Sequence, residues 1–373
     1  MLYRNETKIR VPSVRTDMHI LLAIVALLLV LGSIFIYSSS SVFALEQHHS
    51  SHFFLRKQAM GMAFGFLCAL VTSLVPLHCI HRYTPAFFCI TVAITALSLV
   101  TPCAVRIHGS SRWVKLGFLV FQPSELMKVG LLLYVAYYLD KKHATQRRSI
   151  KPFVALIATL IIPSIILLSQ PDFGFTVTLV STTIITCLVA SFYVRYLGLS
   201  MVALIPAVVF LIVRYPYRAK RITTFLDPWR DPQGTGFQII QSLIAIGSGG
   251  IHGTGIGESQ QKYFYLPMQH TDFIFSIIAE EIGFCGVSVL ILLYILFLYC
   301  GLRLANTLHN PFSRLFVLSF TVLITVQAVI NMAVVTGLAP TKGIGLPFIS
   351  YGNTNLVTNL IMLGIVVAMV KSE

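Results

Sequence analysis

Asp272 is the residue of this chain whose setting most strongly suggests a chemical role. The stretch from Gly247 to Phe273 reads GSGGIHGTGIGESQQKYFYLPMQHTDF, and Asp272 stands just before a long apolar run. An acid at the mouth of a hydrophobic span is costly unless it is paired or takes part in function. Asp272 is therefore the first candidate functional residue.

A second pair of charges stands at a predicted helix start, in the sequence QPSELMK. Ser124 can cap the helix, Glu125 suits its first turn, and Lys128 lies three residues on, on the same face. Two interpretations stay open. Glu125 and Lys128 form an ion pair that lets both charges sit near lipid, or Glu125 orients a cation that binds an anionic ligand.

Basic residues at spacings of four and three open a long polar segment. Arg214, Arg218 and Arg221 would share one face of a helix. Guanidinium groups arranged in this way suit a phosphate or pyrophosphate, which arginine can bind with two parallel hydrogen bonds. Contact with lipid headgroups is the alternative.

Two further polar segments are open to more than one interpretation. The turn Gln170-Pro171-Asp172-Phe173-Gly174 places Asp172 where it can cap the next helix, and this structural role is the favoured one. The glycines between Gly247 and Gly257 could cradle a phosphate, but they match neither nucleotide-binding fingerprint. They are better explained as turns that bring Lys262 and Asp272 to one site.

The composition is that of an all-α polytopic membrane protein. Hydrophobic residues make up 56% of the 373 residues, charged residues 11%, and the mean hydropathy is +0.82. The apolar runs are of helix length and lack strand alternation. About ten spans are predicted, at His19–Leu45, Met60–Cys79, Pro85–Val105, Ser124–Leu139, Phe153–Leu168, Gly174–Tyr193, Leu197–Val213, Phe273–Cys300, Leu315–Thr336 and Pro347–Val370.

Lysine and arginine set the expected orientation. With the N-terminus inside, more of these residues fall on cytoplasmic than on outer segments, which favours cytoplasmic termini. Residues 1–373 then form one integral membrane domain, with a basic cytoplasmic tail at 1–18 and one large extracytoplasmic loop at 214–272. The net charge of +14 does not indicate nucleic-acid binding, because no basic soluble domain is present.

The predicted outer face concentrates the scarce acids. Only 13 residues are acidic, and four of them lie at or near span ends on this side: Glu125, Asp172, Asp272 and Glu281. Packing alone does not explain this concentration. Proton or ion transport would instead place ionisable groups at the middle of the membrane.

Several motifs in order along the chain resemble one family. They are Arg112-Trp113 with Gln122-Pro123-Ser124-Glu125 and Lys128; Gln170 to Gly174; Phe225-Leu226-Asp227-Pro228-Trp229; Gln261-Lys262 through Leu266-Pro267 to His270-Thr271-Asp272-Phe273; Glu280-Glu281-x-Gly283; and Pro340-Thr341-Lys342-Gly343 through Leu346 to Gly352. The chain resembles the SEDS family of peptidoglycan glycosyltransferases, which includes FtsW, RodA and SpoVE. IYSSSSV in the first span and Ser259–Lys262 are closer to FtsW and SpoVE than to RodA.

The resemblance implies an enzyme that polymerises lipid II, an undecaprenyl-pyrophosphate-linked disaccharide peptide, into glycan strands for cell division. The site would face the outside of the bacterial cytoplasmic membrane. Asp272 matches the catalytic aspartate, so it is the expected general base for the acceptor hydroxyl. Candidates for substrate binding are Lys128, Glu125, Arg112, Gln122, Arg214, Arg218, Lys262, His270, Lys342 and Ser350, with Asp172 and Glu281 as supporting acids.

The leaving pyrophosphate calls for cations or a metal, so Mg²⁺ or Mn²⁺ is the candidate cofactor, and no organic cofactor is expected. The resemblance also implies as partners a class B penicillin-binding protein transpeptidase and other divisome proteins, besides membrane lipid. This chain departs from the family pattern at Val120, Met268 and Asn353-Thr354-Asn355. These changes leave Asp272 and Lys128 in place but bear on the substrate contacts.

Two other functions remain as alternatives. A lipid II flippase would need a polar path across the membrane, and the charges of this chain gather outside instead. A non-catalytic scaffold for a transpeptidase would not need Asp272 and Lys128.

Overall fold

The computed structural model describes residues 14–99, 104–107, 110–116, 119–142, 150–192, 196, 198, 216–262 and 269–373. It is mostly helical. The helices are α1 Val14–His48, α2 Phe53–Ser73, α3 Leu77–Leu97, α4 Pro123–Lys142, α5 Ile150–Ser169, α6 Phe173–Val189, α8 Pro216–Leu226, α9 Phe237–Gly249, α10 Ile274–Thr307, α11 Pro311–Val335 and α12 Asn353–Lys371, with a 3-10 turn η1 at Pro228–Arg230.

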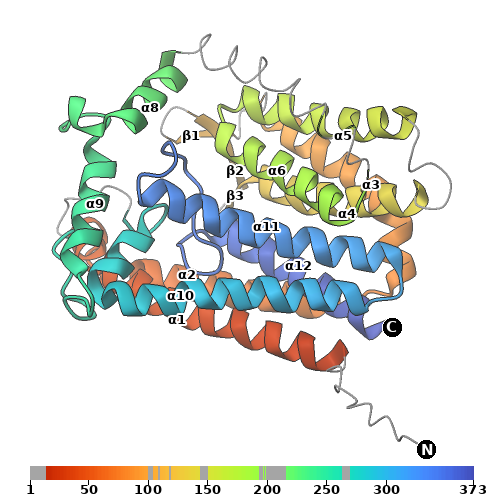
Figure 1. Ribbon diagram of the computed structural model, residues 1–373, viewed down its shortest axis with the longest axis horizontal. Helices are drawn as coiled ribbons and strands as arrows, with labels where there is room; N and C mark the ends of the chain where they lie inside the picture. The colour runs from red at the N-terminus through yellow and green to blue at the C-terminus, as the bar shows by residue number, and fades with distance from the viewer. Residues whose placement is uncertain are drawn as a thin grey trace, which may run out of the picture.

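The helices form a multi-pass membrane bundle. Seven described helices are long and apolar enough to cross a membrane: α1, α2, α3, α5, α10, α11 and α12. Nine of the ten predicted spans overlap a helix, whereas nearly all of the span predicted at Leu197–Val213 lies outside the described residues. α1 begins and α12 ends at one end of the bundle, and α8 and α9 lie at the opposite end (Figure 1).

Close packing of α2 against α12 forms one side of the bundle. A Cβ at Gly65 would stand 2.5 Å from Leu360 Cδ1, and one at Gly364 would stand 2.3 Å from the Ala69 carbonyl oxygen. Small residues at such positions let two helix backbones approach, which is how helices associate within lipid. The position of α12 is therefore tightly coupled to that of α2.

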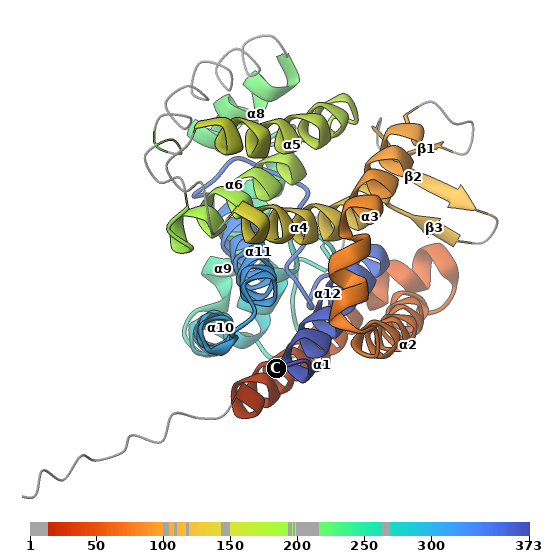
Figure 2. The ribbon, with the colours of Figure 1, turned by 90° about the vertical axis from the view of Figure 1, so that its right-hand side faces the viewer.

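A small antiparallel sheet interrupts the helices, so the all-α prediction is wrong in this respect. Its strands are β1 Ala104–Ile107, β2 Ser110–Leu116 and β3 Leu119–Phe121, in the order β1-β2-β3. The sheet lies at the edge of the bundle, beside α3 (Figure 2). The third span was predicted at Pro85–Val105, about eight residues too far along the chain, because α3 runs from Leu77 to Leu97. The apolar residues at the end of the predicted span belong in part to β1.

α10 is broken at Gly283, where φ is 63° and ψ is −169°. A left-handed φ of this kind favours glycine. The loop after α9 satisfies the interrupted backbone: Gly250 O accepts from Phe284 N at 2.9 Å, and Ile251 O accepts from Cys285 N at 3.1 Å. Irregular backbone at membrane depth is tolerated where protein covers it.

The break divides the predicted eighth span after its two acids. Glu280 and Glu281 lie in the first part of α10, about two turns after Asp272 as expected, and the break at Gly283 follows them. Their carbonyls accept the backbone N–H groups of Thr254 and Gly255 at 2.9 and 3.0 Å. The glycine-rich run therefore packs against the break in α10.

The last span is also shorter than predicted. α12 begins at Asn353 rather than at Pro347, because the preceding residues form a compact turn in which Phe348 has a φ of 65°. Ser350 Oγ accepts from Leu346 N at 2.7 Å within this turn.

Candidate active site

Asp272 lies in the turn that leads into α10, and a buried asparagine fixes its backbone. Asn331, on α11, donates from Nδ2 to the Asp272 carbonyl oxygen at 2.7 Å and to the Ile344 carbonyl oxygen at 2.8 Å. Asn331 is 2% exposed. This one amide joins the Asp272 turn to the loop between α11 and α12.

That loop passes directly beside the Asp272 carboxylate. A Cβ built on Gly343 would stand 3.2 Å from Asp272 Oδ2. The neighbouring residue, Lys342, is thereby placed next to the acid. The sequence elements Thr341-Lys342-Gly343 and Thr271-Asp272 thus meet, although about 70 residues separate them in the chain.

The turn between α5 and α6 is the third segment of the site, after the Asp272 turn and the loop between α11 and α12. Arg112, on β2, donates from Nε to Gln170 O at 3.2 Å and from Nη2 to Pro171 O at 2.5 Å, and its Nη1 lies 3.4 Å from Asp172 Oδ2. Asp172 caps α6, accepting from Phe175 N at 3.2 Å. The capping interpretation of Asp172 is confirmed, and Arg112 clamps the turn against the sheet.

The charges around Asp272 set its basicity. Burial raises the pKa of Asp272 to about 6, the Arg112 and Arg221 guanidinium groups oppose this rise, and Asp172 adds to it. Burial also raises the pKa of Asp172, despite its ion pair with Arg112. A carboxyl group with a pKa near the working pH is well suited to accept a proton.

Lys342 is the cationic residue that directly precedes Gly343, the residue that lies against Asp272. Its Nζ lies 5.2 Å from the centroid of the Phe173 ring, and within the described part of the chain no carboxylate or carbonyl oxygen binds it. Burial, together with the Arg221 charge, lowers the pKa of Lys342. Arg221 itself donates to Thr341 O at 2.7 Å, which ties α8 to this loop.

Glu125 and Lys128 form a separate, buried cluster. Their side chains lie 2.5 Å apart, and Lys128 also donates to Asn355 and Asn359 of α12. The predicted ion pair on one face of α4 is confirmed. Gln122 precedes the cluster, and its carbonyl oxygen accepts from Glu125 N at 3.1 Å.

His270 is packed among aromatic rings. Its ring centroid lies 4.4 Å from that of Phe54 and 5.7 Å from that of Tyr351, and the His270 side chain is buried. Burial lowers the pKa of His270 to about 4, so the imidazole is neutral at pH 7. Its carbonyl oxygen accepts from Tyr351 N at 3.0 Å. His270 therefore holds the Asp272 turn in place, and Ser350 closes the neighbouring turn.

Lys262 lies in the loop that packs against the break in α10, and Glu281 lies on α10 just before that break. Lys262 Nζ donates to the Gly257 carbonyl oxygen, and Glu281 accepts from Ser38 of α1. The neighbouring Glu280 accepts from Ser259 Oγ and from Gln260 N. Both acids thus fasten the loop to the bundle. Two arginines of the predicted series were candidates for substrate binding. Arg214 lies outside the described residues, and only the backbone of Arg218 is described, in α8.

The residues around Asp272 do not fit a metal ion held by the protein. Across the described ranges, no three His, Cys, Asp or Glu side chains come together. The two Asp172 oxygens face Phe175 N and the Arg112 guanidinium group. A divalent cation prefers several oxygen ligands, whereas the surroundings of Asp272 are rich in cations.

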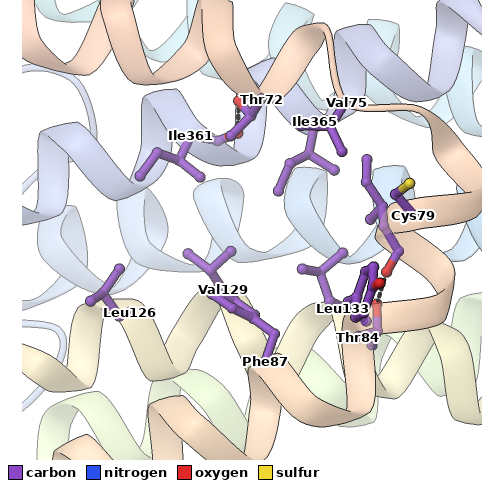
Figure 3. Close-up of a pocket in the computed structure, with 12 residues that line it drawn as sticks. Thr72, Val75, Cys79, Thr84, Phe87, Leu126, Val129, Leu133, Ile361 and Ile365 are labelled. Carbon is purple, nitrogen blue, oxygen red and sulfur yellow. Dashed lines mark hydrogen bonds between the residues drawn. The ribbon is translucent and has the colours of Figure 1, made fainter.

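An apolar cavity of about 370 Å³ lies between α2, α3, α4 and α12. Leu126, Val129 and Leu133 of α4 line it on one side, and Ile361 and Ile365 of α12 line it on the other (Figure 3). Its α4 wall begins next to Glu125 and Lys128. The cavity is lined almost entirely by apolar side chains, and the Glu125 and Lys128 side chains are not among its lining residues.

The site contains two residues that the sequence did not single out, Asn331 and Asn359, and a third, Asn355, that was noted only as a departure from the family pattern. Each is an asparagine within or at the start of an apolar helix, and a polar residue in an apolar run was the available signal. Arg221 belongs to the predicted arginine series and is the member that the structure places beside Thr341.

Comparison with known proteins gives consistent matches over nearly the whole chain. The family model FTSW_RODA_SPOVE, described as cell cycle protein, matches residues 18–373. A probable peptidoglycan glycosyltransferase FtsW from Trichlorobacter lovleyi is 41% identical over 350 residues, which cover 94% of this chain and 91% of the relative. Stage V sporulation protein E of Bacillus subtilis is 35% identical over 353 residues, covering 94% and 96%.

Solved structures share the fold. A chain from a structure described as "Structural coordination of polymerization and crosslinking by a peptidoglycan synthase complex" matches with a TM-score of 0.77 and 31% identity, covering 94% of this chain and 96% of that one. Rod shape determining protein RodA of Thermus thermophilus matches with a TM-score of 0.70 and 26% identity, covering 94% and 95%.

Proposed function

Because this chain belongs to the FtsW, RodA and SpoVE family and is a peptidoglycan glycosyltransferase, we propose that Asp272 is its general base. The substrate is lipid II, and the reaction joins an acceptor sugar hydroxyl to the anomeric carbon of a donor. The observation that carries this assignment is the Asp272 carboxyl group, which has a pKa of about 6 and lies directly beside Lys342-Gly343.

The proposed step balances as a single displacement. The acceptor hydroxyl gives its proton to the Asp272 carboxylate while its oxygen bonds to the anomeric carbon. The bond from that carbon to the phosphate oxygen breaks, and its electron pair leaves with the lipid pyrophosphate. A direct attack of this kind inverts the anomeric centre. The pyrophosphate is a stable anion, so it leaves without a general acid.

Lys342 and Arg221 are the proposed cations for the leaving group. Lys342 is supported by its place next to Asp272 and by its lack of an oxygen partner among the described residues. Fixed cations aimed at developing negative charge are a large source of transition-state stabilisation. Any Mg²⁺ or Mn²⁺ is proposed to arrive with the pyrophosphate, since the described residues do not form a metal site of their own.

The lipid chain of the substrate is proposed to enter the apolar cavity between α2, α3, α4 and α12 (Figure 3). An apolar chain gains about 25 cal/mol for each Å² that it removes from water, and an apolar cavity of this size suits several methylene units. The sugar and pyrophosphate would remain at the polar end of the bundle.

The site is proposed to face the extracytoplasmic side. At the end of the bundle where α1 begins, α4, α10 and α12 end and α11 begins (Figure 1). These helix ends carry Lys141, Arg303, Lys371 and Arg314, as expected for a cytoplasmic face. Residues 216–262 and 269–272 belong to the opposite end (Figure 1). A class B penicillin-binding protein is the proposed partner, supported by the match to a chain of a peptidoglycan synthase complex.

The test is polymerisation of labelled lipid II by the purified chain in proteoliposomes, with and without a class B penicillin-binding protein. Glycan strands in either condition support the proposed reaction. Transfer of lipid II across the bilayer without strands would instead favour a flippase. Neither strands nor transfer, with the partner bound, would favour a scaffold.

A further inference from the structure

The Lys128 ammonium group is completely occupied by the protein. It lies 2.5 Å from Glu125 Oε2, and it donates to Asn355 Oδ1 at 3.1 Å and to Asn359 Oδ1 at 3.0 Å. An ammonium group has three hydrogens to donate, so these three acceptors use all of them. Lys128 is 0% exposed.

The acceptors are joined to one another as well. Asn359 Nδ2 donates to Asn355 Oδ1 at 2.8 Å. The Thr358 hydroxyl lies 3.3 Å from Glu125 Oε2 and 3.0 Å from the carbonyl oxygens of Thr354 and Asn355, which share its one hydrogen. The cluster therefore links the first turns of α4 to the first two turns of α12. Networks of buried polar groups whose members are all satisfied fix the relative position of the elements that carry them.

We propose that Lys128 is a positioning residue, which sets the start of α12 and does not bind the pyrophosphate. This inference rests on the proposed function of Asp272 and Lys342. The start of α12 directly follows the loop that carries Lys342 and Gly343, so a shift of α12 would move Lys342 relative to the acid.

A second connection reaches the acid from its own side. Tyr351, two residues before α12, donates its backbone N–H to the His270 carbonyl oxygen at 3.0 Å. His270 is two residues before Asp272. The Lys128 cluster thus acts on both the cation and the base through α12.

The first test compares Lys128→Met with the double variant Lys128→Met and Glu125→Gln. The single variant leaves the buried Glu125 charge without its partner, and the double variant removes both charges. We expect kcat of the single variant to be at least about 100-fold below that of wild type. We expect kcat of the double variant to be about tenfold higher than that of the single variant. We expect KM for lipid II to stay within about twofold of wild type in the double variant.

The second test leaves Lys128 and Glu125 in place. Asn355→Ala with Asn359→Ala removes the α12 acceptors, so a positioning role predicts a fall in kcat of about tenfold or more. If Lys128 binds substrate, freeing it from the asparagines would leave kcat unchanged or raise it.

Lipid II binding without turnover separates this inference from the proposed function. The probe is labelled lipid II in detergent, bound to each variant in the Asp272→Asn background. We expect the triple variant Lys128→Met, Glu125→Gln and Asp272→Asn to bind lipid II with a Kd within about twofold of that of Asp272→Asn alone. Binding weaker by about tenfold or more would overturn the positioning role, whether or not Asp272 is the base.

Discussion

Gly343 lies against Asp272 so closely that a Cβ at residue 343 would stand 3.2 Å from the Asp272 Oδ2 atom. A contact of this length is tighter than ordinary van der Waals contact, so the absence of a side chain is what lets the two backbone segments approach. The approach brings the backbone of Lys342 close to the acid. One glycine therefore helps to position both the proposed base and the residue that carries the proposed leaving-group cation.

Gly343→Ala is expected to slow polymerisation by up to about tenfold, since the Asp272 carboxylate must move by a few tenths of an ångström and a displacement of about 1 Å at a reacting group costs about 100-fold. The initial rate with labelled lipid II measures the effect. Gly247→Ala is the matched control, because a Cβ at Gly247 has open space around it. Equal rates for the two variants would show that the contact between residues 343 and 272 does not matter for the reaction.

Lys342→Met is expected to lower kcat by about 100-fold, the effect of removing one group that stabilises developing charge. Lys342→Arg should recover part of the rate by keeping the charge. Lys220→Met is the control, since Lys220 is 61% exposed and lies 3.8 Å from Asp231. A wild-type rate for Lys342→Met would remove Lys342 from the mechanism.

The dependence of rate on pH should report the Asp272 carboxyl group. The base must be ionised, so kcat/KM should fall as the pH drops below about 6. Arg112 lowers the pKa of Asp272, so Arg112→Gln should raise that pKa and move the acidic limb to higher pH. Arg230→Gln, at an exposed position on η1, should leave the limb where it is. An acidic limb that Arg112→Gln moves to lower pH, or not at all, would contradict this electrostatic account.

The loop packed on the break in α10 should be sensitive to side-chain volume. A Cβ at Gly253 would stand 2.2 Å from the Glu281 carbonyl oxygen, and Gly253 has a φ of +83°. Gly253→Ala is therefore expected to destabilise the fold by about 2 kcal/mol or more. Thermal unfolding in detergent tests this, with Gly247→Ala again as the control. Equal melting temperatures would mean that the loop moves away at little cost.

Local patterns in the sequence predicted the contacts that lie within one turn of helix. The spacing of Glu125 and Lys128 predicted their ion pair, and the Pro-Asp-Phe-Gly turn predicted the Asp172 cap. Apolar runs predicted nine of the ten spans as helices because burial in lipid leaves few other ways to satisfy the backbone.

Contacts between distant segments were not predictable in the same way. The partners of Lys128 on α12 lie more than 220 residues away, and no pattern in a single sequence relates the two segments. The sheet and the break at Gly283 were missed for a related reason. The sheet pairs strands that are neighbours in the chain, and the loop after α9 satisfies the backbone at the break. Hydropathy records neither kind of hydrogen bond.

Asp272→Asn tests the central claim most directly, through the initial rate of lipid II polymerisation in proteoliposomes at pH 7.5. The substitution keeps the shape of the side chain and removes its ability to take a proton, so a loss of at least about 100-fold is expected. The variant should unfold no more easily than wild type. Burial raises the pKa of Asp272 from its ordinary value of 3.8 to about 6, so the ionised acid destabilises the fold above pH 6. Strand synthesis at the wild-type rate by this folded variant would contradict the proposed mechanism.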